Sequence, residues 1–150
     1  MPIFDWLKAL HLSAFVLGLG AAATKFILIS SQRRSEDAKR VQVSEELALL
    51  INKKLESRFL EVAWVLGLIL TILKSEYWSQ GWLHAKLTIT ILMIGLSHMS
   101  AASLRKIGNL RAESAAAEKI DAAKSRLNIF GIVMGVLALA TFYLVILQPF

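Results

Sequence analysis

The residues most able to do chemistry in this chain are its three histidines, and all of them fall in long apolar segments. Titratable side chains are costly inside a membrane and mark functional sites there. His11 follows Trp6 by about five residues, and His84 follows Trp82 by two. On two helices that run in the same direction, these imidazoles are expected at similar depth. Such a pair is able to supply both axial ligands of a haem iron, or else each ring only hydrogen-bonds a neighbouring helix.

A second group of titratable residues is expected nearer the other end of the same helices. His98 lies about four turns after His84, and thus on the same face. Lys25 lies the same distance after His11, and Glu61 is placed to neutralise it. A cluster of this kind handles protons or binds a carboxylate-bearing ligand. Alternatively, Lys25 reaches the aqueous interface with its amine and His98 has a structural role.

Lys86 lies two residues after His84, so it points to another side of its helix. It either extends to the outer interface or meets a haem propionate. Other kinds of site lack support. The absence of cysteine excludes thiolate metal sites, disulfides and cysteine nucleophiles. No phosphate-binding glycine loop, nucleophile triad or carboxylate cage is recognisable, and the Gly131 and Gly135 pair indicates close helix packing.

Four apolar segments must carry these residues. The hydrophobic fraction is 56%, and the apolar residues gather in runs separated by charged stretches, which is typical of membrane proteins. We therefore predict a single all-α domain, a bundle of four transmembrane helices with helical cytoplasmic extensions. The predicted spans are residues 3–30, 59–73, 82–104 and 127–147. Each approaches the roughly 20 residues that cross a hydrocarbon core.

The basic residues predict the orientation. Segments 31–58 and 105–126 carry most of them, whereas the opposite side has only Lys8 and Lys74 near the helix ends. The positive-inside rule places both long loops in the cytoplasm and both termini outside, in a bacterial inner membrane. The net charge of +6 is then explained by these basic loops. The predicted partner is the lipid bilayer, and no nucleic acid is expected. An aromatic belt on the outer side supports these boundaries: Trp6, Tyr77, Trp78 and Trp82.

Both basic segments are expected to be helical. Ser44, followed by Glu45 and Glu46, is expected to cap a helix that begins near Glu45 and leads into the second span. Segment 112–126 is rich in Ala, Glu and Lys, and is expected to extend the fourth helix. These extensions are either solvated ends of the bundle or a surface for a partner.

Several stretches resemble the HemJ family of membrane protoporphyrinogen oxidases, within the broader CopD-like group. The most specific is Trp82-Leu-His-Ala-Lys-Leu87, which is similar to the family's third-helix motif. The resemblance extends over the whole chain through Trp6-Leu-Lys-Ala-Leu-His11, segment 53–67, Gly95 with His98, and the closing helix from Leu127-Asn128 to Gln148-Pro149-Phe150.

The resemblance implies oxidation of protoporphyrinogen IX to protoporphyrin IX, with haem b bound and electrons passed to the respiratory chain through quinone. His11 and His84 match family histidines that would hold the haem iron, and Lys86 matches the motif lysine. As catalytic candidates, Lys86, Lys25 and His98 would bind propionates or move protons.

The chain departs from the family at the inner end of its first helix. The family has a Pro-Arg motif and a Tyr-His there, where this chain has Ala23-Thr24-Lys25-Phe26. A lysine can replace the arginine as a cation but not as a bidentate fork. The family's second-helix proline is also missing, near Glu61 to Trp64. These departures bear on catalysis more than on the fold.

Two other functions remain open. One is a non-catalytic subunit of a larger membrane complex, or a homo-oligomer, which would pack through small-residue helix faces and the helical extensions. The other is copper handling within the CopD-like group. The sequence supports it only weakly, because soft sulfur ligands suit copper and the chain has four methionines and no cysteine.

Overall fold

The computed structural model describes residues 2–32, 35 and 37–148. Within this part of the chain every regular element is a helix and no strand occurs, so the all-α prediction is confirmed. The elements are α1 (Pro2–Ser31), α2 (Ala38–Ile51), the π-helical η2 (Asn52–Glu56), α3 (Ser57–Leu73), the 3₁₀-helical η3 (Ser75–Ser79), α4 (Gly81–Ala112) and α5 (Ala117–Leu147).

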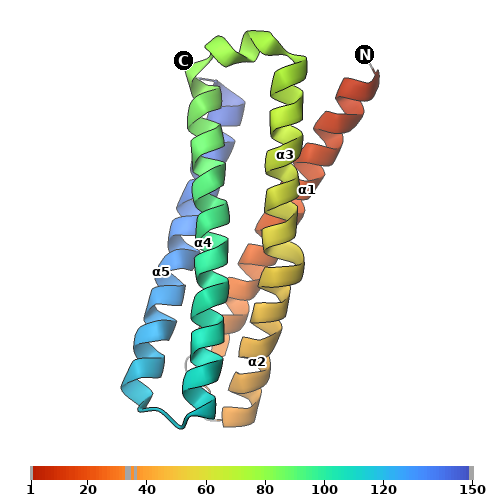
Figure 1. Ribbon diagram of the computed structural model, residues 1–150. Coiled ribbons are helices and arrows are strands. Elements are labelled where there is room, and N and C mark those ends of the chain that lie inside the picture. Colours follow the sequence, from red (N-terminus) through yellow and green to blue (C-terminus); the bar gives the residue numbers. More distant parts are fainter. Residues whose placement is uncertain (1, 33–34, 36, 149–150) are drawn as a thin grey trace.

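Three of these elements form one long rod. Asn52 and Ser57, at the two junctions, both have right-handed helical dihedrals, so α2, η2 and α3 continue into one another without a break. Figure 1 shows this rod beside α4 and α5, with α1 crossing the bundle at an angle. The start of α1 and the end of α5 lie at the end of the bundle that carries η3.

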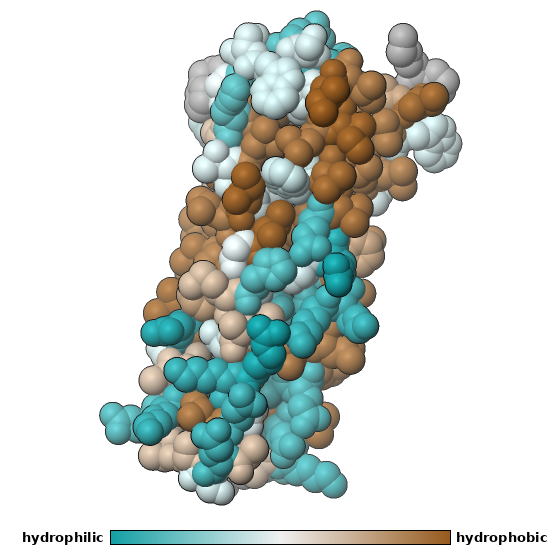
Figure 2. Space-filling view, in the orientation of Figure 1, coloured by the Kyte–Doolittle hydropathy of each residue, from teal (hydrophilic) through white to brown (hydrophobic). Residues whose placement is uncertain are grey.

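Three helices are long and apolar enough to cross a membrane: Ile3–Ser31, Gly81–Ala112 and Ala117–Leu147. Their outer faces are apolar as well, and Leu139 and Ile146 on α5 are 72% and 74% exposed. Figure 2 shows this hydrophobic surface over the upper part of the molecule and hydrophilic side chains gathered at the lower end. The fourth apolar helix, α3, has 17 residues and is shorter.

Three apolar clusters hold the helices together, and one of them contains Trp82, Leu83 and Leu144 near η3. The other two lie further along the bundle. The first lies at mid-height and includes Phe15, Leu60 and Met93. The second lies among Ile29, Leu104, Ile107 and Leu127, towards the basic end. Glycines allow close approach at two helix crossings. A Cβ on Gly18 would meet Leu60 at 3.1 Å, and one on Gly131 would collide with the Phe26 ring, whereas one on Gly135 would meet nothing.

The helix that leads into α3 begins earlier than expected. Asp37 caps it by accepting hydrogen bonds from the backbone N–H groups of Lys39 and Arg40, at 3.1 and 3.2 Å. The prediction of Ser44 as the cap was therefore wrong, because Ser44 and Glu45 are buried inside the helix. The prediction that both basic segments are helical is confirmed, since α2 and the first turns of α5 occupy them.

Glu45 joins three helices at the basic end. Its carboxylate accepts two hydrogen bonds from Arg111 on α4, at 2.7 and 2.9 Å, and lies 3.0 Å from the amine of Lys124 on α5. Burial raises the pKa of Glu45, but these hydrogen bonds and charges outweigh it and hold the pKa below its ordinary value. The carboxylate therefore stays charged and links α2 to both neighbours.

Glu45→Gln is expected to lower the free energy of unfolding by about 2 kcal/mol at neutral pH, because charge-assisted hydrogen bonds are lost. Since the folded-state pKa is depressed, the stabilisation is complete above the ordinary carboxyl pKa and is lost as the pH falls through the folded value. Thermal unfolding in detergent between about pH 7 and pH 3 measures this. The exposed Glu113→Gln is the control. Equal pH dependence of wild type and Glu45→Gln would contradict the assignment.

Candidate functional site

A cavity of about 250 Å³ lies at the end of the bundle where α1 begins, bounded by α1, α3, η3, α4 and α5. Aromatic rings form much of its wall, including Phe15, Tyr77 and Trp82. Its polar groups include the His11 imidazole and the amines of Lys8 and Lys86. Small-molecule sites run from about 300 Å³ upward, so a ligand larger than this cavity requires the helices to separate around it.

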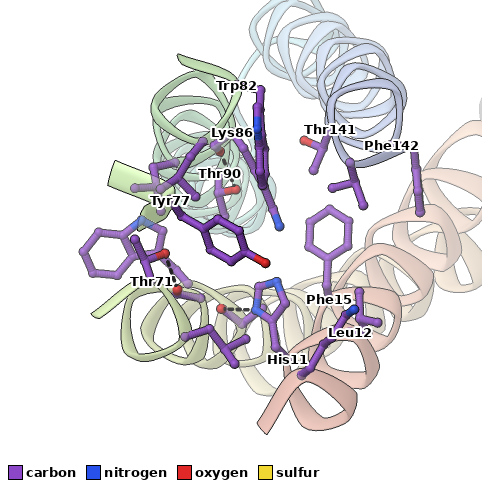
Figure 3. Close-up of a pocket in the computed structure, with 18 of the residues that line it drawn as sticks. His11, Leu12, Phe15, Thr71, Tyr77, Trp82, Lys86, Thr90, Thr141 and Phe142 are labelled. Atoms are coloured by element: carbon purple, nitrogen blue, oxygen red, sulfur yellow. Dashed lines mark hydrogen bonds between the residues drawn. The ribbon is translucent and has the colours of Figure 1, made fainter. Parts of the chain in front are cut away.

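His11 is fixed by its neighbours. Its Nδ1 lies 2.7 Å from the carbonyl oxygen of Ala63, and its side chain is buried. A carbonyl only accepts, so Nδ1 carries a proton, and in the neutral imidazole Nε2 then keeps a free lone pair. Gly67 makes room for the ring, because a Cβ there would lie 3.1 Å from the imidazole Cε1. Figure 3 shows the ring on the wall of the cavity with this hydrogen bond.

Lys86 enters the same cavity from α4. Figure 3 shows its amine, the Tyr77 hydroxyl and the His11 ring directed towards the middle of the cavity. Among the residues that the structure describes, no carboxylate lies within 4.0 Å of the Lys86 amine. A lysine in such surroundings attracts an anion.

The aromatic belt is only partly formed. Trp6 and Trp78 are exposed at the end of the bundle that carries η3, but Trp82 is 8% exposed and packs edge-on against Tyr77. Trp82 therefore belongs to the cavity wall and not to the lipid interface. Trp64 also lines the cavity, and its indole N–H is buried without a hydrogen-bond acceptor in the described residues. A ligand atom that accepts a hydrogen bond would satisfy it.

His84 does not share the cavity with His11, so the expected pairing of these rings is not formed here. The His84 side chain is exposed and lies near Trp78, with ring centroids 6.1 Å apart. Two residues correspond to about 200° around a helix, so only one of His84 and Lys86 can face inward. The buried face of α4 recurs at three- and four-residue spacing through Leu83, Thr90, Met93, Ser97 and Leu104, and this spacing includes position 86.

The cavity therefore provides one residue placed to ligate a haem iron, His11, and not two. A histidine that donates from one ring nitrogen to a backbone carbonyl is oriented to ligate through the other, which describes His11. Lys8, Lys86 and the Tyr77 hydroxyl suit the carboxylates of a tetrapyrrole. His84 does not fit as a second ligand in this arrangement. Within the described residues, no cluster of three or more His, Asp or Glu side chains suits a metal ion held by protein alone.

The inner titratable residues pair differently from the prediction. Lys25, on α1, forms an ion pair with Glu56 of η2, with its amine 2.7 and 2.8 Å from the two carboxylate oxygens. Both side chains are buried, at 6% and 0% exposure. Glu61 therefore does not neutralise Lys25, because it lies more than a turn further along the rod on a different face. The pairing with Glu56 also occupies the cation that was expected to meet a propionate.

His98 and Glu61 meet on the surface of the bundle instead. The His98 Nε2 lies 3.1 Å from a Glu61 carboxylate oxygen, and the two side chains are 59% and 36% exposed. Arg58 also approaches Glu61, at 3.6 Å. The three predicted catalytic residues thus lie in three places: Lys86 in the His11 cavity, Lys25 in a buried pair, and His98 on the exposed face of α4.

A buried polar layer surrounds the Lys25–Glu56 pair. The Asn52 amide donates to the Ser97 carbonyl and hydroxyl, at 3.2 and 3.3 Å, and the Ser57 and Ser97 hydroxyls lie 2.9 Å apart. Sequence reasoning missed Asn52 and Glu56 because they precede the apolar run. Their four-residue spacing, which puts both polar side chains on one helix face, is the signal that could have identified them.

Comparison with known proteins found no match: no family model, no curated protein and no solved structure matches this chain. The likeness to the HemJ family therefore depends on the sequence motifs alone.

Lys25→Met is expected to lower the free energy of unfolding by about 3–5 kcal/mol, because it leaves the Glu56 carboxylate buried and unpaired. The double variant Lys25→Met/Glu56→Met is expected to recover most of this loss, since no buried charge remains. Denaturant unfolding of all three proteins in one detergent gives the coupling. Lys53→Met, at an exposed position of η2, is the matched control. A double variant that loses the sum of both single effects would argue against the pair.

Proposed function

We propose that the chain crosses the membrane four times, with α3 as the additional span and both termini on the outer side. The 17 residues of α3 cover about 26 Å, close to a hydrocarbon core of about 30 Å. The rod continues through η2 and α2, so basic side chains near its inner end can extend to the headgroups. Basic residues gather at this end, which favours its placement in the cytoplasm of a bacterial cell.

We further propose that the outer cavity binds a carboxylate-bearing tetrapyrrole and that His11 ligates haem b there. The observation that carries this proposal is the hydrogen bond from His11 to Ala63, which leaves Nε2 available as a ligand in a cavity that also contains the Lys86 amine. In line with the HemJ resemblance, the reaction would be oxidation of protoporphyrinogen IX to protoporphyrin IX, with electrons passed to quinone.

The residues of the cavity divide this work among them. Bound haem would supply a one-electron redox centre. Lys86 and Lys8 would hold ligand carboxylates, and the Tyr77 hydroxyl and the Trp64 indole would donate hydrogen bonds. The hydroxyls of Thr71, Thr90 and Thr141 already donate to carbonyls of their own helices, at 2.9 Å each, so they can only accept. The aromatic wall would exclude water and pack against the macrocycle.

Single cysteines provide a direct test of the four-span topology, because the chain has no other cysteine. A membrane-impermeant maleimide is expected to label Asp5→Cys and Glu76→Cys in intact cells, and Glu113→Cys only after lysis. If α3 does not cross, positions 5 and 76 lie on opposite sides, and only one of them is labelled in intact cells. That result would exclude the fourth span.

The visible spectrum of the protein purified in detergent tests the haem site. Wild type is expected to show a Soret band. His11→Ala is expected to lose the Soret band, whereas His84→Ala keeps it, because only His11 lies on the cavity wall. His98→Ala is a second control on the outer surface. Loss of the band in His84→Ala and not in His11→Ala would contradict the assignment.

Catalysis has a separate readout. Expression of wild type is expected to rescue a strain that lacks protoporphyrinogen oxidase, and Lys86→Met is expected to fail while it still binds haem. A colourless wild-type preparation would exclude the haem site and favour a non-catalytic subunit of a membrane complex. Haem without rescue would favour a haem-binding relative that does not catalyse this reaction.

A further inference from the structure

A second concave site lies on the outer surface of the bundle, far from the His11 cavity along the helices. It is a groove of about 410 Å³ between the η2–α3 part of the rod and α4. Its rim carries four basic side chains and one acidic side chain: Lys53, Lys54, Arg58, Arg105 and Glu61. Ser57 and His98 also line it. Figure 2 shows hydrophilic side chains on this face reaching up between hydrophobic surfaces.

The charges of this groove are only partly balanced. Glu61 is shared between His98, at 3.1 Å, and Arg58, at 3.6 Å. Across the described ranges, no carboxylate lies within 4.0 Å of Lys53, Lys54 or Arg105. The groove therefore presents several uncompensated cations on two helices, which suits an anion that can bridge them.

The depth of the groove indicates where that anion comes from. Counted from Gly81, where α4 begins, His98 lies about 26 Å and Arg105 about 36 Å away. Counted back from Leu73 along the rod, Arg58 lies about 22 Å and Lys54 about 28 Å away. The groove thus straddles the inner boundary of a core about 30 Å thick, where phospholipid phosphates lie. A soluble acidic peptide would have to enter the hydrocarbon to reach Glu61 and His98.

The surface above the groove is apolar. Towards η3, Val65 lies one turn from Glu61 on α3 and Ile91 lies two turns from His98 on α4. Each is on the same helix face as the groove residue. Their side chains are 49% and 53% exposed. A cationic pocket that continues into an exposed apolar strip matches a phosphate headgroup followed by its acyl chains.

We propose that this groove binds the phosphate headgroup of an anionic phospholipid in the leaflet at the η2 end of the bundle. Lys53, Lys54 and Arg105 contact the phosphate, and the acyl chain lies along the faces of α3 and α4 that carry Val65 and Ile91. The site depends on the membrane crossing of these helices but not on haem or on the proposed reaction.

Native mass spectrometry of the detergent-purified protein, titrated with phosphatidylglycerol or with phosphatidylcholine of the same acyl chains, tests this site. Wild type is expected to bind phosphatidylglycerol more tightly. Lys53→Gln/Lys54→Gln/Arg105→Gln is expected to weaken that binding about tenfold or more. The matched control Lys39→Gln/Arg40→Gln/Lys119→Gln removes as many exposed charges outside the groove and is expected to change little.

Glu61→Gln gives the opposite prediction, which a folding defect cannot imitate. Removing the only acid of the groove frees Arg58 and His98, so phosphatidylglycerol is expected to bind several-fold more tightly. Equal weakening by the groove and control variants would overturn the proposal, and so would equal affinity for phosphatidylcholine. Displacement of the lipid by an equimolar amount of inorganic phosphate would also overturn it, since the groove would then be a site for free phosphate.

Discussion

The buried ion pair between Lys25 and Glu56 is the constraint on which the rest of the bundle depends. An ammonium or a carboxylate alone would be costly at this depth, so each requires the other. Their contact determines which part of α1 lies against η2 and how the two helices are rotated about their axes. Asn52 and Ser57, on either side of Glu56, then reach Ser97 and add α4 to the same polar layer. The π-helical turn, common at functional and strained sites, is where the rod presents these side chains together.

The same pair determines the face of α1 that meets the rod. Lys25 and His11 are about four turns apart, so a helix that directs one towards the rod also directs the other. Between them, Gly18 allows close contact with Leu60. Three contacts therefore connect α1 to the rod along its length, and the last one orients the imidazole through Ala63. Since these contacts lie within the protein, the His11 ring is oriented before any ligand arrives.

The helices, the apolar segments and the burial of His11 against a neighbouring helix could be predicted from the sequence. They follow from periodicity and from the cost of polar groups in lipid. The sequence was not sufficient for the rotation of each helix. His84 and Lys86 sit in one motif, and only the three- and four-residue spacing of the buried α4 residues decides which of them faces inward. Glu56 was missed for a similar reason, since its partner is 31 positions away and the pairing is a tertiary contact.

A comparison of buried Lys25 with half-buried Lys86 explains why the His11 cavity suits a ligand. Both sit on apolar helices, where an uncompensated ammonium is costly. Lys25 is compensated by Glu56, so its charge contributes to folding and leaves nothing for a ligand. Lys86 has no such partner in the described residues, and the nearby groups are rings, hydroxyls, an imidazole with a free nitrogen and another lysine. Water or an anion is able to compensate its charge. A ligand that brings both a carboxylate and an atom able to accept a lone pair from His11 would satisfy both groups, which is the physical basis for proposing a metallated tetrapyrrole there.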